Sequence, residues 1–194
     1  FNTKMPEEIN RIVCDHVSTL LFCPTQTSVK NLEKEGITHG VECVGDIMYD
    51  GVLYSQQKAS CTILDSLGLE PQKYILATVH RAENTDNSSR LKAIVQALGD
   101  AAHSIGSVVL PLHPRTRKIL SEQGIELSKS IRVIDPTPYL ETIALLQNAK
   151  AIMTDSGGMQ KEAFFLQTPC LTLRDETEWV ETIDCDANKL VGAD

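Results

Sequence analysis

The chain has 194 residues, 42% of them hydrophobic, and its formal net charge at pH 7 is −8. That length allows one large domain, or one domain plus part of another, with a buried core. The acidic residues are spread along the chain rather than gathered in a tail, which argues against a nucleic acid or an anionic membrane as partner. An anionic small ligand would therefore need local cations or backbone amides.

The cysteines and the apolar runs bear on the compartment. Six cysteines are scattered without any C-x-x-C pair, and several fall in apolar runs, as is typical of reduced packing residues. No apolar run approaches the length of a membrane span, and no basic stretch followed by an apolar one opens the chain. We therefore expect a cytosolic protein. Because the chain opens at Phe1 without an initiator Met, we also expect a fragment.

The first 45 residues indicate a short opening α/β unit. Pro6-Glu7-Glu8 is typical of a helix start, because proline fits the first turn and carboxylates complement the helix dipole there. Apolar residues then recur on one helical face. A short strand at 21–23, a helix from about 26 that Gly36 stops, and a strand at 41–44 complete the unit. We interpret residues 1–45 as the tail of a preceding domain.

The rest of the chain alternates regularly between strand and helix signals. Residues 46–68 indicate a largely helical connector. The predicted strands that follow are 74–79, 108–112, 131–134, 151–154 and 169–173. Helices of ten or more residues fit between them. Because these strands are nearly continuous apolar runs, they indicate a parallel sheet covered on both faces, and the predicted fold class is a doubly wound α/β domain.

Polar segments follow each predicted strand directly. They are His80 to Asn84, His113-Pro114-Arg115, Asp135-Pro136, Asp155 to Gly158, and Arg174 to Glu178. Any one of these could simply be a polar loop. Ligands of open parallel sheets bind outside the carboxyl ends of the strands, so five successive loops of this kind predict a site on that rim.

The segment from Ser156 to Glu162 passes from a predicted buried strand straight into a helix. Gly157 and Gly158 let the backbone approach a ligand, while free amides and the positive end of the helix dipole attract phosphate. Ser156 could add a hydroxyl donor, and Glu162, about one and a half turns further on, could accept from both ribose hydroxyls. The alternative is that Ser156 only caps the helix and that Glu162 is a solvated surface side chain.

His80 directly follows a strand, where it could act as a general acid or base or donate to a phosphate. A buried, hydrogen-bonded loop histidine is the alternative. His113, before Pro114, is predicted to shape its turn. No cluster has the ligand spacing of a zinc site, and neither a Walker A loop, nor G-x-G-x-x-G, nor a G-x-S-x-G elbow is present, so the sequence supports no ATPase, dehydrogenase or α/β-hydrolase.

Four segments together resemble the non-hydrolysing UDP-N-acetylglucosamine 2-epimerases. They are Pro6 to Arg11, Val79 to Asn84, Asp155 to Glu162, and Arg174 to Glu178. The resemblance runs over essentially the whole chain. It implies two Rossmann-like domains in the glycosyltransferase-B arrangement, with residues 1–45 ending the first domain and 46–194 forming the UDP-binding second. It further implies a UDP-sugar substrate, no cofactor, no metal, and a homodimer when full length.

That family eliminates UDP from the sugar to give a 2-acetamidoglucal and adds it back after reprotonation at C2 from the other face. The resemblance assigns catalysis to Glu7 and His80. It assigns UDP binding to Ser156, Gly157, Gly158, Glu162 and the uracil-facing Thr137. The other acidic residues of the family pattern would lie before Phe1.

The sequence departs from the best-known bacterial pattern, most clearly where Trp179 stands in place of an expected ligand arginine. This form resembles the branch that includes epimerases of UDP-2,3-diacetamido-2,3-dideoxyglucuronate, so the sugar stays open. Two other functions stay open as well: a UDP-sugar glycosyltransferase of the same arrangement and a non-catalytic UDP-binding module. Glu7 and His80, in their motifs, favour the epimerase.

Overall fold

The computed structural model describes residues 6–193, and the side chains of residues 8–193. The chain divides into two compact units whose boundary lies between Gly51 and Val52. This boundary falls inside helix α3 (Ile47–Lys58), a little beyond the 45/46 boundary suggested by the sequence. The assignment of residues 1–45 and 46–194 to two domains of a larger arrangement stays a prediction.

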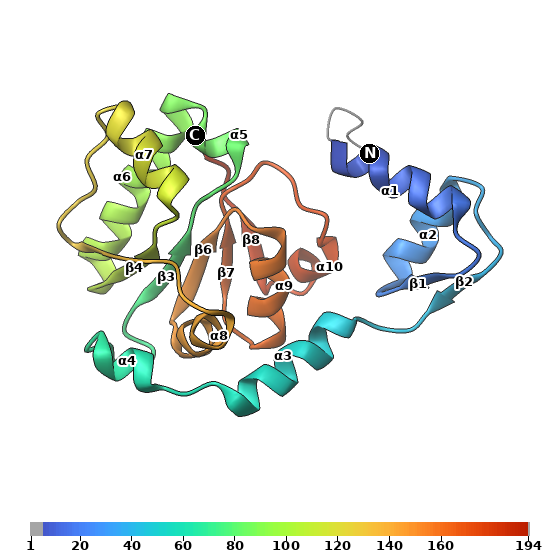
Figure 1. Cartoon of the computed structure of the whole chain (residues 1–194), viewed down its shortest axis with the longest axis horizontal. Coiled ribbons are helices and arrows are strands. Elements are labelled where there is room, and N and C mark those ends of the chain that lie inside the picture. The colour runs from blue at the N-terminus through green and yellow to red at the C-terminus, as the bar shows by residue number, and fades with distance from the viewer. Residues whose placement is uncertain (1–5, 194) are drawn as a thin grey trace. The chain divides into compact units, whose positions relative to one another are not determined.

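The first unit contains α1 (Pro6–Val17), β1 (Leu21–Cys23), α2 (Gln26–Lys34) and β2 (Val41–Cys43) (Figure 1). The two strands are parallel, with Leu21 opposite Val41. Thr25 caps α2 by accepting a hydrogen bond from the Ser28 N–H, as expected of a threonine in that position. The predicted elements of this unit are therefore confirmed.

The second unit is built on a six-stranded parallel sheet. Its strands are β3 (Ile75–Thr78), β4 (Val108–Pro111), β5 (Ile131–Ile134), β6 (Ala151–Thr154), β7 (Cys170–Thr172) and β8 (Asn188–Leu190). Its strand order is β5-β4-β3-β6-β7-β8. The chain thus builds outward from β3 to one edge and then from β6 to the other, which makes the β3–β6 boundary the switch point of the sheet.

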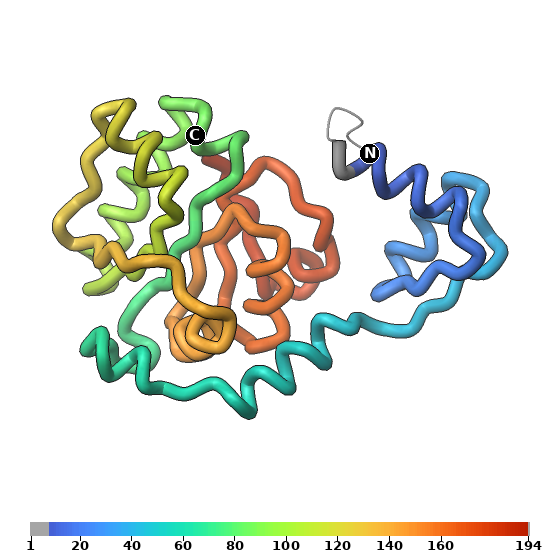
Figure 2. Tube along the Cα trace, viewed as in Figure 1, coloured from blue at the N-terminus to red at the C-terminus, as the bar shows by residue number. Residues whose placement is uncertain are grey.

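Helices connect the strands and cover both faces of the sheet. They are α4 (Thr62–Ser66), α5 (Ala82–Thr85), α6 (Ser88–Ile105), α7 (Pro114–Glu122), α8 (Tyr139–Asn148), α9 (Gly157–Phe165) and α10 (Val180–Asp184). Figure 2 lets the chain path within this unit be followed. The expectation of at least ten residues per helix is wrong for α7 and α9, which have nine each.

Two hydrophobic clusters form the core, one on each face of the sheet. One cluster packs residues of α6, such as Leu91 and Leu98, against Ile75 and Ala77 of β3. The other packs residues of α8 and α9 against Leu76 of the same strand. Successive β3 side chains thus point into opposite clusters, which is the reason that the strand is apolar from Ile75 to Ala77. The doubly wound fold predicted from that pattern is confirmed.

None of the helices in the described part of the chain combines the length and the apolar character needed to cross a membrane.

Candidate functional site

The candidate site lies at the switch point, where β3 and β6 end side by side. Thr78 is in register with Thr154, and their hydroxyl oxygens are 2.6 Å apart. His80 follows β3, and Asp155 and Ser156 follow β6, so the parallel pairing brings these two polar loops together. Two of the polar segments predicted to form the rim, the one after β3 and the one after β6, therefore meet at this edge of the sheet.

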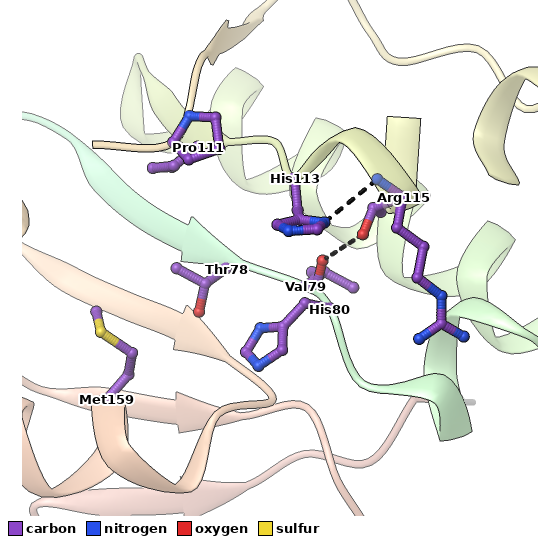
Figure 3. A pocket seen from close by; sticks show the side chains of 9 residues that line it. Thr78, Val79, His80, Pro111, His113, Arg115 and Met159 are labelled. Carbon is purple, nitrogen blue, oxygen red and sulfur yellow. Dashed lines mark hydrogen bonds between the residues drawn. The ribbon is translucent and has the colours of Figure 1, made fainter. Parts of the chain in front are cut away.

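A hollow of about 440 Å³ opens at this edge. It is lined by Thr78, Val79, His80, Pro111, His113, Arg115, Thr116, Pro136 and Met159. Its volume lies within the range of roughly 300–1,000 Å³ that is typical of small-ligand sites. Figure 3 shows the His80 and His113 rings in the hollow, with Met159 of α9 on its other side. Among the residues assigned to the site from the sequence, His80 is the one that lines the hollow.

The turn from β6 into α9 is held by Ser156. Its hydroxyl accepts a hydrogen bond from the Met159 N–H at 3.4 Å, and its own N–H donates to the Thr154 hydroxyl at 3.0 Å. Ser156 is thus the N-cap of α9, which agrees with the alternative interpretation that Ser156 caps the helix. The amides at the start of α9 still form the positive end of a helix, the usual place for a phosphate group, and a ligand contact of Ser156 stays a prediction.

The two glycines at the start of α9 face different surroundings. Gly157 is buried, and a methyl group there would overlap a carboxylate oxygen of Glu178 and lie 3.4 Å from the Trp179 indole nitrogen. Gly158 is exposed, and a methyl group there would have no neighbour closer than the Ser156 hydroxyl at 3.9 Å. The surface beside Gly158 is therefore open to a ligand.

Glu162 is only 7% exposed, so the interpretation as a solvated surface side chain is wrong. Burial raises the pKa of its carboxyl group, although a hydrogen bond with the Tyr139 side chain opposes the increase. Burial and the neighbouring Glu162 raise the pKa of Tyr139 to about 12. Thr137, two residues before Tyr139, shares a 2.9 Å hydroxyl hydrogen bond with Thr142 of α8. The start of α8 is thus joined to Glu162 through Tyr139.

Trp179, in the place of the expected arginine, packs the loop before α10 onto α9. Its indole N–H donates to the Gly157 carbonyl oxygen at 2.9 Å, and the Lys161 ammonium lies 3.9 Å from its ring centroid. In the same loop the buried Arg174 forms a 2.8 Å ion pair with Glu178. The sequence pattern did not show the two Trp179 contacts, because they join positions about twenty residues apart through side-chain packing.

The two rim histidines are held differently. The backbone N–H of His80 donates to both carboxylate oxygens of Asp155, at 3.2 and 3.1 Å. His113 caps α7, and its Nδ1 accepts a hydrogen bond from the Arg115 N–H at 3.2 Å, so the prediction that His113 shapes its turn is confirmed. The sequence placed the His113-Pro114-Arg115 segment on the rim, but it did not show that the His113 and Arg115 side chains line the hollow, and it gave Met159 no such role.

Glu7, the remaining predicted site residue, lies in α1, and its side chain is outside the described residues. Among the described side chains, no group of three or more His, Cys, Asp or Glu residues is placed to hold a metal ion.

Comparison with known proteins identifies the family of the chain. The family described as UDP-N-acetylglucosamine 2-epimerase matches residues 1–194. A UDP-2,3-diacetamido-2,3-dideoxy-D-glucuronate 2-epimerase of Pseudomonas aeruginosa is 52% identical over 100% of this chain and 54% of its own length. A UDP-N-acetylglucosamine 2-epimerase homolog of Methanococcus maripaludis is 50% identical over 100% of this chain and 55% of its own length.

Among solved structures, the UDP-GlcNAc 2-epimerase of Methanocaldococcus jannaschii in complex with UDP-GlcNAc and UDP is similar, with a TM-score of 0.89 and 40% identity. That match covers 100% of this chain and 56% of the other. The chain thus spans about half the length of the curated relatives it matches. The matched residues include every motif on which the resemblance rested, and the chain belongs to the UDP-N-acetylglucosamine 2-epimerase family.

Proposed function

We propose that the complete natural protein containing this chain epimerises a UDP-2-acetamido sugar at C2, and that this chain supplies the UDP-binding half of the site. The observation that carries the proposal is the turn from Ser156 to Glu162. It has an open helix start and a buried carboxylate, and it lies at the switch point, where His80 lines a hollow of about 440 Å³. Members of the family with solved structures include one in complex with UDP-GlcNAc and UDP.

In this proposal the start of α9 binds the diphosphate. Ser156 and the amides of Gly157 and Gly158 donate to phosphate oxygens, and Glu162 accepts from the ribose hydroxyls. Thr137 lies in the turn that faces the uracil. These contacts suit a helix start that is exposed at Gly158 and a carboxylate that is already partly desolvated at Glu162.

The reaction proceeds by elimination and re-addition. A base takes the C2 proton, the C1–oxygen bond breaks, and its electron pair leaves with UDP, which gives the 2-acetamidoglucal. A proton then reaches C2 from the opposite face while a UDP oxygen re-forms the bond to C1. Glu7 is proposed as one carboxylate of the proton transfers, and His80 as the residue of this chain that exchanges a proton or a hydrogen bond with the reacting groups.

The sugar is proposed to be UDP-N-acetylglucosamine or its diacetamido-glucuronate relative. The second candidate rests on the Pseudomonas aeruginosa relative and on Trp179, which fills the place of an expected arginine. A cytosolic location, which rests on the cysteine pattern and the apolar runs of the sequence, and a homodimer, which rests on the family resemblance, are part of the same proposal.

The test is to incubate the complete protein with each UDP-sugar in deuterated water without any acceptor. We expect the C2 epimer to form and deuterium to enter at C2, both visible by proton NMR. A glycosyltransferase would give neither product. Binding of UDP without exchange at C2, on either sugar, would contradict the epimerase proposal and support a non-catalytic binding module.

A further inference from the structure

Asp155 is a fully buried carboxylate at the centre of the site. It follows β6 directly and faces the loop that follows β3. Its Oδ2 accepts hydrogen bonds from the N–H groups of His80 and Arg81, at 3.1 and 3.0 Å, and from the Asn84 amide at 3.1 Å. Its Oδ1 accepts from the His80 N–H at 3.2 Å. A buried carboxylate that receives this many donors is held in one orientation.

The Asn84 side chain holds the Asp155 carboxylate in this orientation. Asn84 is fully buried, and its amide nitrogen donates both to Asp155 and to the Leu173 carbonyl oxygen. Its amide oxygen accepts from the Arg90 guanidinium at 3.2 Å. Because a guanidinium can only donate, the oxygen of Asn84 must face Arg90 and the nitrogen must face Asp155. Asp155 cannot turn without breaking this chain of contacts.

The arrangement leaves one oxygen of Asp155 directed at the His80 ring. The Nδ1 atom of His80 lies 3.4 Å from Oδ1, slightly beyond the usual range for a hydrogen bond of roughly 2.7–3.2 Å. The ring itself is half exposed and lies in the hollow (Figure 3). A carboxylate offers only lone pairs, so it favours the ring form in which the nitrogen that faces it carries a proton. Nε2 is then the ring atom left to meet a ligand.

We propose that Asp155 is a positioning residue that holds His80 as the Nδ1–H tautomer and directs Nε2 into the hollow. The consequence for turnover rests on the proposed function, whereas the tautomer itself does not. An oriented ring exchanges a proton or a hydrogen bond with a reacting group through one defined atom. Buried aspartates that fix a catalytic histidine in this way account for large parts of its activity in other enzymes.

The neighbouring His113 provides an internal comparison. Its Nδ1 accepts a hydrogen bond from the Arg115 N–H, so that nitrogen has no proton and the neutral ring is the Nε2–H tautomer. Two histidines that line the same hollow are therefore assigned opposite tautomers. This contrast follows from the groups that face the two Nδ1 atoms, a carboxylate at His80 and a backbone N–H at His113, and does not depend on a ligand.

The first arm of the test measures the tautomers in the chain as it stands. Two-bond nitrogen–proton correlation NMR on ¹⁵N-histidine-labelled protein, at a pH where the rings are neutral, distinguishes the two forms. The signals are assigned by their loss in His80→Gln and His113→Gln. We expect the Nδ1–H form for His80 and the Nε2–H form for His113. In Asp155→Asn, His80 should shift towards the Nε2–H form while His113 is unchanged.

An Nε2–H form of His80 in the unsubstituted chain would overturn the proposal, and so would an unchanged His80 in folded Asp155→Asn. The first of these measurements needs no variant, so the proposal can be overturned even when Asp155→Asn does not fold.

The second arm measures turnover and UDP affinity in the complete protein. We expect Asp155→Asn to lower kcat by roughly 10² or more while the dissociation constant of UDP stays within about threefold, because the general acid–base contribution is lost and the UDP contacts remain. Asp100→Asn, the same change at an exposed position of α6, is the matched control and should behave as wild type. A shifted tautomer with unchanged kcat, or equal losses of kcat, UDP affinity and stability, would contradict a positioning role. Absence of epimerisation by the unsubstituted protein would instead contradict the proposed function, and the NMR arm would still decide the role of Asp155.

Discussion

Replacement of Glu162 by glutamine separates the cost of burying its charge from the benefit of that charge to a ligand. The side chain is 7% exposed and shares a hydrogen bond with Tyr139, and glutamine keeps its size and an acceptor oxygen. If the carboxylate accepts from the ribose hydroxyls, each charge-assisted bond worth about 1.5–3 kcal/mol becomes a neutral one worth about 0.5–1.5 kcal/mol. UDP should therefore bind roughly tenfold more weakly, or worse.

The same change should stabilise the fold at neutral pH. Burial raises the pKa of Glu162 above its ordinary value of 4.5, so the folded state holds the proton more tightly than the unfolded state. The stability associated with this group is fully present below 4.5 and is lost as pH rises through the raised pKa. Glutamine does not titrate. The melting temperature of Glu162→Gln should match that of wild type in acid and exceed it at neutral pH.

Calorimetric titration with UDP and thermal melting at several pH values test both halves of this prediction. Glu126→Gln, at an exposed loop position, is the matched control and should change neither quantity. Tyr139→Phe removes the hydrogen-bond partner and should move the pKa of Glu162 further upward. Unchanged UDP affinity in folded Glu162→Gln would remove the ribose role, and a melting-temperature difference independent of pH would refute the burial argument.

The other predictions concern the loops around the hollow. His80→Ala should lower turnover of the complete protein by at least 10² while its melting temperature changes little, because the ring is half exposed; collapse of the fold with normal turnover would show a structural role. Gly158→Ala should leave the free energy of unfolding unchanged or raise it by about 0.5–1 kcal/mol, since nothing crowds the methyl group. The same change should weaken UDP binding in calorimetry, and full UDP affinity would remove Gly158 from the diphosphate site. Trp179→Phe should cost about 0.5–1.5 kcal/mol in urea unfolding through the lost bond to Gly157, and no cost would mean that the contact is dispensable. The 194-residue chain alone should bind UDP weakly and should not exchange the C2 proton of the UDP-sugar with deuterated water. Exchange at an enzymatic rate would show that Glu7 and His80 suffice for the proton transfers.

The sheet was predictable because each of its inner strands carries its own signal. β3, β4 and β6 are buried on both faces, which requires a run of apolar residues that can be read without knowing the neighbours. The edge strand β8 has no such run. Asn188 begins it, and its buried amide is satisfied by hydrogen bonds to Gln160 and Thr182 and from Thr172. Those partners come from three other elements, so the local sequence could not reveal the strand.

The location of the site was predictable for a related reason, and its side-chain pairs were not. Strand ends in a parallel sheet lie on one edge, so the loops after β3 and β6 had to meet once their strands paired. The buried Glu162 instead shares a hydrogen bond with Tyr139, which belongs to a different helix. The sequence left open whether the Glu162 side chain is a solvated surface group or faces a ligand, because its position within α9 does not say which side of the helix is covered. Whether the Glu162 side chain is buried depends on how α8 packs against α9, and that packing is a property of the whole fold.

The two glycines of the Ser156-Gly157-Gly158 segment show why one motif can record two separate constraints. The sequence suggests the same reason for a glycine at both positions, namely that the backbone must approach a phosphate closely. In the structure Gly157 is covered by the carboxylate of Glu178 and the Trp179 ring, so its side chain is excluded by the protein itself even without a ligand. Gly158 has no such neighbour, and its surface faces solvent. An alanine at Gly157 must therefore first move the carboxylate of Glu178, which is paired with Arg174, whereas an alanine at Gly158 alters only the surface offered to a ligand. Loss of UDP affinity at Gly158 is for that reason the cleaner evidence for a diphosphate site, because no change in packing accompanies it.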